Sequence, residues 1–216
     1  MKSNRRFCAS ILVSISATAC SGNRNVTPDS RDFPIENPDA HHEIRILGEI
    51  APEFEVSFTA YWEATNTESI RCRYYLGLYA RYAGLVDYLN VSNPLSMSRS
   101  GKSYQAKVVA DKYLPGFCRW SLRNVTYQIY TNGTLDSHGL VLLHPDEPLR
   151  PSGGRFGDSD SFKQEKGPLT MVCSQQPNWM TKRPTWYCKP NGTTQRALVG
   201  ITQELRELNA DFVRAQ

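Results

Sequence analysis

The stretch Asp111–Tyr130 constrains the fold more than any other part of the chain. It contains a turn signal at Leu114-Pro115-Gly116, because proline presets φ near about −65° and glycine accepts a positive φ. After the turn the apolar residues change parity, from Cys118, Trp120 and Leu122 to Val125, Tyr127 and Ile129. One extra residue, a β-bulge near Arg123-Asn124, would return the later set to the inward face. The stretch therefore predicts two strands joined by a turn, the second of which is bulged.

The same period of two recurs along the chain. Residues 53–63 alternate throughout, with apolar side chains at Phe54, Val56, Phe58, Ala60 and Trp62, as in a half-buried antiparallel strand. Further strands are expected near 44–47, 71–82, 104–110 and 140–143, with a small hairpin from 171–174 and 185–188. About seven strands separated by turn signals predict a mainly β fold, either an antiparallel β-sandwich or a barrel-like sheet.

Two segments of the domain depart from this pattern. Residues 145–168 are rich in proline, glycine and charge, and we expect a mobile surface loop there. Near the C-terminus, apolar residues recur at spacings of three and four, which predicts an amphipathic helix. They are Leu198, Ile201, Leu205, Leu208 and Phe212.

Residues 1–19 have the features of a secretory signal. A basic start with Lys2, Arg5 and Arg6 precedes a short apolar run that ends in Ala17-Thr18-Ala19-Cys20, and this run is too short for a membrane span of about 20 residues. Residues 20–42 contain few apolar side chains, so we expect a flexible tether, followed by one domain from 43 to 216. Removing the signal lowers the 25 Lys and Arg to 22, against 21 Asp and Glu. This near balance, without runs of like charge, argues against nucleic-acid binding.

The cysteines of the expected domain number four. Cys8 leaves with the signal, and Cys20 belongs to the N-terminal segment. An even number in an exported chain indicates two disulfides, for which three pairings are possible. We favour Cys72–Cys118 and Cys173–Cys188, because the second pair spans the small hairpin. A zinc site would be the rival use of these residues, but the chain has no C-x-x-C pair.

No catalytic or cofactor motif stands out in the sequence. The chain lacks the G-x-S-x-G and H-E-x-x-H patterns of hydrolases and metalloproteases. We therefore expect no enzymatic activity, no metal and no cofactor, although catalytic groups can converge from distant positions, so a hydrolase stays an alternative.

The most suggestive side chains lie on the expected strand at 71–82. Its outward set would be Arg73, Tyr75, Tyr79 and Arg81. Tyrosine and arginine are enriched where protein interfaces concentrate their binding energy. Tyrosine is also a good strand former, and Tyr–Arg packing on a solvated face is ordinary, so a merely structural role is the alternative.

Ala-Thr-Ala-Cys after an apolar run resembles the lipobox of bacterial lipoproteins, in which Cys20 would carry acyl chains. Together with the Leu-Pro-Gly-x-Cys-x-Trp-x-Leu-x-x-Val-x-Tyr stretch at Leu114–Tyr127, the chain resembles small proteobacterial envelope lipoproteins. Some of these sit beside phospholipase effectors of type VI secretion and are taken to be their immunity proteins.

The resemblance implies a lipid-anchored binding protein whose partner in the periplasm would be a secreted toxin. Ser21 follows Cys20, where an aspartate would favour retention in the inner membrane, so an outer-membrane location facing the periplasm is implied. A scaffold or assembly lipoprotein of the envelope is the competing interpretation.

Overall fold

The computed structural model describes residues 26–28, 30, 32–66, 68–75, 86–144, 163–164, 168–177, 183–191 and 197–215. This part of the chain is mainly β, as the sequence predicted, and it contains no α-helix. Two of the segments discussed above fall outside it. The signal with Cys20 lies before its first residue, and the expected mobile loop at 145–168 is represented only by Lys163, Gln164 and Pro168.

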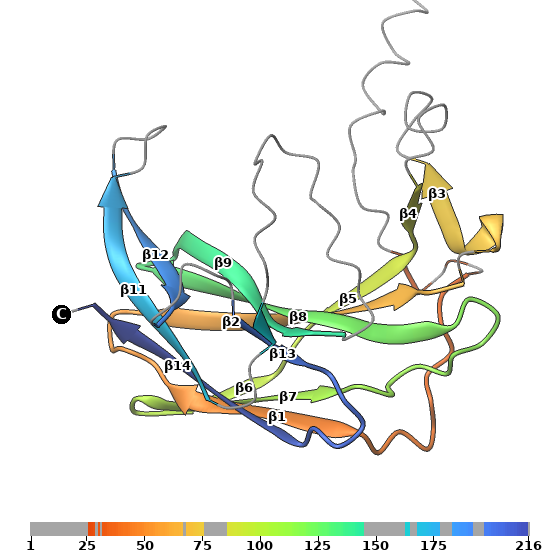
Figure 1. Cartoon of the computed structure of the whole chain (residues 1–216), viewed down its shortest axis with the longest axis horizontal. Coiled ribbons are helices and arrows are strands. Elements are labelled where there is room, and N and C mark those ends of the chain that lie inside the picture. The colour runs from red at the N-terminus through yellow and green to blue at the C-terminus, as the bar shows by residue number, and fades with distance from the viewer. Residues whose placement is uncertain are drawn as a thin grey trace, which may run out of the picture.

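The strands form two six-stranded sheets and one small two-stranded sheet. The first sheet has the order β12-β11-β14-β1-β7-β6 and the second has the order β10-β13-β9-β8-β2-β5, while β3 pairs with β4. The bounds are β1 Glu43–Glu49, β2 Glu55–Ala64, β3 Arg73–Tyr75, β4 Val86–Tyr88, β5 Asn90–Pro94, β6 Met97–Ser100, β7 Ser103–Val109, β8 Trp120–Thr131, β9 Thr134–Leu143, β10 Lys163–Gln164, β11 Leu169–Pro177, β12 Pro184–Pro190, β13 Ala197–Gly200 and β14 Glu207–Arg214. Figure 1 shows β1, β6 and β7 along one side, with β2, β8 and β9 above them.

Both large sheets are mixed, which corrects the antiparallel expectation. In the first sheet, β14 runs parallel to both of its neighbours, β1 and β11. In the second sheet, β13 runs parallel to β9 and to β10, whereas β9, β8, β2 and β5 are successive antiparallel neighbours. The alternation of polar and apolar residues predicts a half-buried strand, but it carries no information on the direction of the neighbouring strand.

Aromatic side chains from the two sheets pack against one another. Phe58 of β2 stacks on Tyr104 of β7, with ring centroids 5.5 Å apart, and Tyr127 of β8 meets Phe212 of β14 edge-on at 5.0 Å. Ile44 and Ile46 of β1 and the predicted apolar set of β2 are fully or almost fully buried. The apolar positions inferred from alternation thus form the core of the domain.

The parity change in β8 is a β-bulge, as predicted. Tyr61 of β2 pairs with Asn124, whereas Trp62 pairs with Leu122, so Arg123 is the extra residue. Trp120, Leu122, Val125, Tyr127 and Ile129 are all buried as a result. The turn before the strand is also found where expected, with a positive φ of 53° at Gly116. It leads from β7 in the first sheet to β8 in the second, so this turn connects the sheets.

The predicted C-terminal helix is wrong. Residues Ala197–Gly200 form β13 and Glu207–Arg214 form β14. Leu208, Ala210 and Phe212 are buried with a period of two. A spacing of four, as between Leu208 and Phe212, fits one face of a strand as well as one face of a helix. The pairing of β14 with strands on both sides decides between the two, because it satisfies the backbone of this segment within the sheet.

The expected strand at 71–82 begins two residues later than predicted, and its residues 76–82 lie outside the described part of the chain. Ile70–Cys72 form a 3₁₀ turn that Ser69 caps by accepting a hydrogen bond from the backbone N–H of Arg71. The strand β3 then covers Arg73–Tyr75.

Residues 32–42 pack on the domain, whereas their composition predicted a tether up to residue 42. Glu36 pairs with Tyr113 in an isolated bridge, and the carboxylate of Asp111 accepts the backbone N–H groups of His41 and His42 at 3.0 and 2.9 Å. Burial raises the pKa of Asp111, but these hydrogen bonds and its own backbone N–H outweigh burial and hold the pKa below its usual value. The carboxylate therefore fixes the entry of the chain into β1.

Both favoured disulfides are confirmed. Cys72 is bonded to Cys118, and Cys173 to Cys188. The first connects the 3₁₀ turn to the loop before β8, while the second connects directly opposite positions of the antiparallel pair β11 and β12.

Candidate partner-binding surface

The structure describes the predicted Tyr/Arg set only in part. Arg73 and Tyr75 lie in β3, where they pair with Tyr88 and Val86 of β4. Of the four side chains only that of Arg73 is described, and it is half-buried. Tyr79 and Arg81 lie outside the described residues, so this set stays a prediction.

A second group of interface-type side chains is presented by the hairpin of β11 and β12 together with the end of β14. We call it the hairpin surface and define it as Trp186, Tyr187 and Arg214. Alternation along β12 turns Trp186 and Cys188 inward and leaves Tyr187 48% exposed on the other face. The disulfide from Cys188 to Cys173 crosses the hairpin one residue from Tyr187.

The indole of Trp186 is the fixed centre of the hairpin surface. It is only 8% exposed, and its ring meets Phe54 edge-on at a centroid distance of 5.0 Å. The guanidinium carbon of Arg214 lies 5.5 Å from the indole centroid, which is within the range of a cation–π contact. Arg214 is thus in contact with a buried ring, while Tyr187 is exposed on the opposite face of β12.

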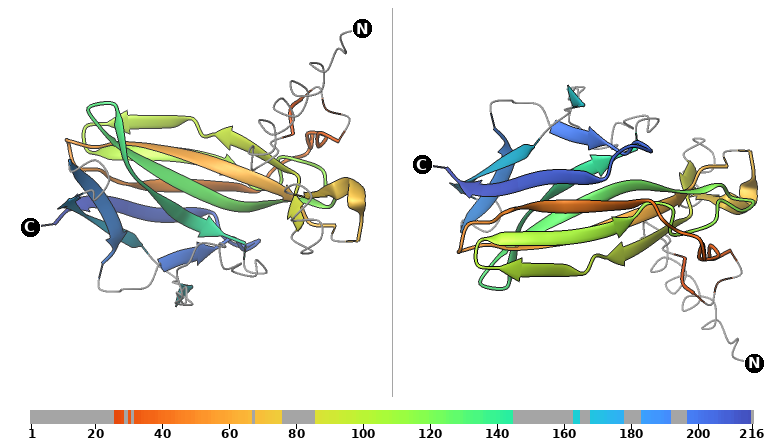
Figure 2. Two further views of the ribbon diagram at one scale, coloured as in Figure 1. Left: turned by 90° about the horizontal axis from the view of Figure 1, so that it is seen from above. Right: turned by 90° about the horizontal axis from the view of Figure 1, so that it is seen from below.

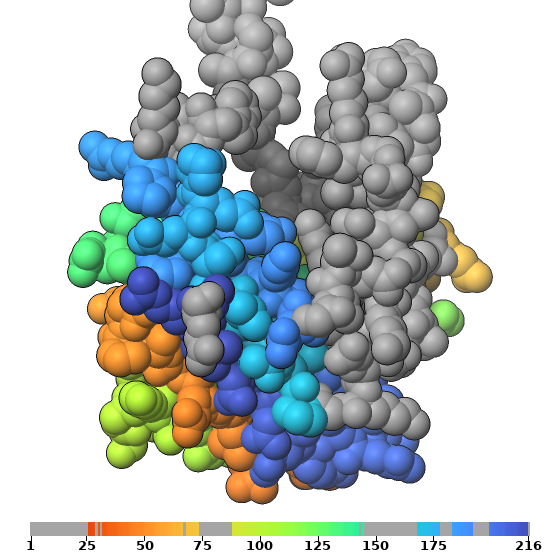
Figure 3. All heavy atoms as spheres, turned by 60° about the vertical axis from the view of Figure 1, so that its left-hand side comes forward, coloured from red at the N-terminus to blue at the C-terminus, as the bar shows by residue number. Residues whose placement is uncertain are grey.

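The hairpin is further connected to the second sheet. The backbone N–H of Cys188 donates to the hydroxyl of Ser137 in β9, and the hydroxyl of Tyr127 in β8 donates to the carbonyl of Cys188, both at 3.4 Å. Figure 3 shows the β8–β9 turn in green beside β11 and β12 in blue, with the end of β14 nearby. The hairpin surface therefore rests on strands of both sheets.

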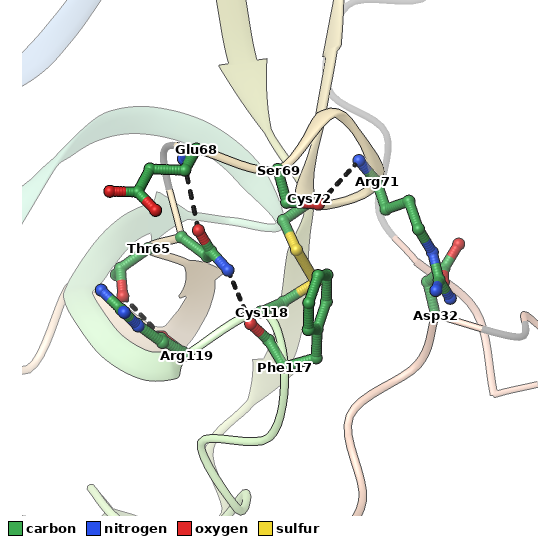
Figure 4. The surroundings of a disulfide bond; sticks show 10 residues. Asp32, Thr65, Glu68, Ser69, Arg71, Cys72, Phe117, Cys118 and Arg119 are labelled. Carbon is green, nitrogen blue, oxygen red and sulfur yellow. Dashed lines mark hydrogen bonds and ion pairs between the residues drawn. A yellow bond between two sulfur atoms is a disulfide. The ribbon is translucent and has the colours of Figure 1, made fainter.

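At the opposite end, apolar side chains gather around the other disulfide. We call this group the disulfide-end patch and define it as Ile35, Ile70, Arg71, Leu114 and Phe117. Ile35 and Ile70 are each 72% exposed, Phe117 is 63% exposed and Leu114 is 38% exposed. Figure 4 shows Phe117 beside the Cys72–Cys118 bond, with Arg71 and Asp32 on one side and Arg119 on the other.

A groove of about 410 Å³ lies between the N-terminal segment, β5 and β7. Its cationic groups are already paired within the chain. Lys107 contacts the carboxylate of Glu43, and the ammonium of Lys112 lies 3.7 Å from Glu36 and 5.2 Å from the ring of Tyr113. Because carboxylates already neutralise both lysines, the groove is poorly suited to bind an anion.

Neither a metal centre nor a membrane-spanning helix is found in the described part of the chain. No three His, Cys, Asp or Glu side chains there gather where a metal ion could bind. Among the same residues, no helix combines the length and the apolar character needed to cross a bilayer.

The sequence reasoning missed the hairpin surface, although part of the signal was present. Alternation through Cys188 places Trp186 on the inner face and Tyr187 on the outer face of the same short strand. No sequence pattern indicated the contact of Arg214 with Trp186, because this contact depends on the parallel pairing of β14 with β11.

Comparison with known proteins adds no relative, since no family model, curated protein or solved structure matches this chain.

Proposed function

We propose that this chain is a lipid-anchored protein of the bacterial cell envelope that faces the periplasm and inhibits a protein partner by binding it. The observation that carries the binding role is the hairpin surface, because the exposed Tyr187 lies on a disulfide-bonded hairpin whose buried Trp186 is in contact with Arg214 of the neighbouring strand β14. These three residue types are the ones enriched at binding hot spots. Rigid aromatic side chains also lose little conformational entropy when a partner covers them.

The anchoring role is supported by the pairing of the cysteines. The four cysteines of the β domain form two bonds with one another. Cys20 therefore has no disulfide partner in the domain, which is what acylation of its thiol requires. Both bonds also fit an oxidising compartment such as the periplasm.

For the architecture, we infer a β-sandwich in which the two mixed sheets face one another. The ring contacts between β2 and β7 and between β8 and β14 support it. So does the direct continuation of β5, an edge of the second sheet, into β6, an edge of the first. In such a sandwich both ends expose loops and hairpins, where binding residues are commonly presented.

Among binding functions we favour an immunity-type inhibitor of a secreted toxin, following the resemblance to envelope lipoproteins described above. A scaffold lipoprotein of the envelope would use the same surface for a resident partner. An uncharacterised hydrolase is the remaining alternative, and it would need a catalytic group for which we have no candidate residue.

Photo-cross-linking in cells tests the binding role and separates these alternatives. A cross-linking residue introduced at Tyr187 should capture a protein partner, whereas one at exposed Leu135 serves as the nearby reference. Capture of a secreted toxin, together with killing of a deletion strain by its parent, would support immunity. Capture of a resident envelope protein would indicate a scaffold, and no specific adduct at either position would contradict the binding role.

Affinity for the captured partner then gives the quantitative test. Tyr187→Ala should weaken binding by at least ~1–2 kcal/mol, while thermal stability should change little because the ring is about half exposed. Leu135→Ala is the control, since it removes an exposed large apolar side chain that belongs to neither surface. Loss of stability with unchanged affinity would show that Tyr187 serves packing and would return attention to Arg73, Tyr75, Tyr79 and Arg81.

A further inference from the structure

The largest exposed apolar side chains are unevenly placed over the described surface. Four of them, Ile35, Ile70, Leu114 and Phe117, belong to the disulfide-end patch. Scattered exposed apolar residues need no explanation, but a cluster of this kind marks a site of contact with protein or membrane.

Backbone contacts join the members of the patch. The backbone N–H of Leu114 donates to the carbonyl of Ile35 at 2.9 Å. The loop that carries Phe117 is closed by the hydrogen bond from the N–H of Trp120 to the carbonyl of Pro115 at 2.8 Å. The Cys72–Cys118 bond then attaches this loop to the 3₁₀ turn that bears Ile70. The apolar side chains are thus presented by a braced structure.

Arginine side chains flank the apolar group. The guanidinium carbon of Arg71 lies 5.6 Å from the Phe117 ring centroid, and one of its nitrogens lies 3.3 Å from the carboxylate of Asp32. Arg119 is exposed, and its carbonyl accepts a hydrogen bond from the hydroxyl of Thr65 at 2.6 Å. Apolar rings and chains beside guanidinium groups match the boundary between lipid headgroups and acyl chains.

The N-terminal segment enters the domain at this same end. The backbone N–H of Val26 donates to the carbonyl of Asn90. The neighbouring Leu89 donates its backbone N–H to the carbonyl of Cys72, which is part of the disulfide at this end. Figure 2 shows the orange segment beside the gold β3 at one end of the molecule, with the C-terminus at the other. Val26 follows Cys20 by six residues, which span about 20 Å when fully extended. An acylated Cys20 would therefore keep this end within about 20 Å of the bilayer surface.

From this placement we propose that the disulfide-end patch docks onto the membrane that holds the anchor. The inference rests on the proposed lipid anchor at Cys20. Phe117, Ile70 and Leu114 enter the interfacial region, while Arg71 and Arg119 donate hydrogen bonds to lipid phosphates. In the docked domain the disulfide-end patch contacts the bilayer, and the hairpin surface at the other end faces the periplasm.

Vesicle binding without the anchor tests the patch by itself. The probe is a vesicle of phosphatidylethanolamine and phosphatidylglycerol, and the protein is residues 20–216 carrying Cys20→Ser, so that no acyl chain contributes. Phe117→Ala should lower the partition onto vesicles about tenfold, which is about 1.4 kcal/mol, because the variant loses the apolar area of the exposed ring. Leu135→Ala is the control, since it removes an exposed apolar side chain at the far end.

The possible outcomes separate the two proposals. Vesicle binding that falls in Phe117→Ala but not in Leu135→Ala supports the docking surface. Absence of binding, or equal binding by the two variants, overturns it. A protein captured by a cross-linking residue at Phe117 also overturns it, because the occupant would then be a protein. The lipid on Cys20 is measured separately by mass spectrometry of the native chain, so a failed anchor is not mistaken for a failed patch.

Discussion

At the scale of single residues, the same arrangement occurs twice in the core. Tyr104 of β7 is paired with Gly48 of β1, and its hydroxyl donates to the carbonyl of Ala210 in β14, one strand further on. Tyr127 of β8 is paired with Gly139 of β9, and its hydroxyl donates to the carbonyl of Cys188 in β12. In each case a tyrosine lies opposite a glycine and reaches past it, to the next strand of its own sheet in the first case and to a strand of the other sheet in the second. Burial raises the pKa of Tyr104 above its usual value, and the charge of Asp211 raises it further, so the hydroxyl stays a donor.

Gly48→Ala tests how closely the backbones approach at this crossing. A Cβ atom at position 48 would lie 2.0 Å from the carbonyl oxygen of Ala210. Because this oxygen belongs to the backbone of β14, the clash can be relieved only if a strand moves. We expect the free energy of unfolding to fall by about 3 kcal/mol or more, as measured by denaturant titration.

The matched control is Gly133→Ala in the β8–β9 turn. Gly133 has a φ of 73°, and a Cβ atom there would meet nothing within 4 Å. The variant should cost only about 1–2 kcal/mol, from the strain of a left-handed alanine. Equal losses in the two variants would contradict a steric role for Gly48.

At the scale of elements, sequence periodicity was informative where only one period fitted. The alternation of β2 and the parity change at Arg123 were sufficient to predict a strand and a bulge. At Leu208 and Phe212 the helical and extended periods coincide, and the prediction failed there. The hairpin surface could be found in part, because the alternation that includes Tyr187 is local to β12. The contact between Arg214 and Trp186 could not, because it depends on which strand lies beside β11.

The two disulfides should differ in their contribution to stability. In the chain-entropy description, the separation of 15 residues between Cys173 and Cys188 corresponds to about 3 kcal/mol. The separation of 46 between Cys72 and Cys118 corresponds to about 4 kcal/mol. We expect the double alanine variant of Cys72 and Cys118 to lose more free energy of unfolding than the double alanine variant of Cys173 and Cys188. A reversed order in urea titrations of the two variants would mean that strain or residual structure outweighs loop length.

At the scale of the whole molecule, the two surfaces for which we propose a function lie at opposite ends. The described chain begins beside the Cys72–Cys118 bond, and its last residues adjoin the Cys173–Cys188 bond, where the N–H of Ala215 donates to the carbonyl of Cys173. The strand order that places the two disulfides at opposite ends could not be predicted from the sequence. Parallel neighbours such as β1 and β14 are far apart in the chain, so their pairing leaves no local sequence pattern.

Localisation belongs to this scale, because it depends on the signal, the N-terminal segment and the domain together. Cys20→Ser should move the protein from the membrane fraction to the soluble fraction, since the proposed docking of the disulfide-end patch would be much weaker than several acyl chains at roughly 0.8 kcal/mol per buried methylene. Fractionation with immunoblotting measures the change. A variant that is processed normally and still sediments with the membrane would refute the lipid anchor.

The strand order also governs when the domain can form. β14 comes last in the chain, yet it lies between β11 and β1 near the middle of the first sheet. Until β14 is available, β1 lacks one of its two neighbours, and β11 with β12 is separated from the rest of the sheet. Such long-range pairing folds slowly. A chain that crosses a membrane from its N-terminus would therefore stay unable to complete this sheet during passage, and folding would be deferred to the compartment where its disulfides can form.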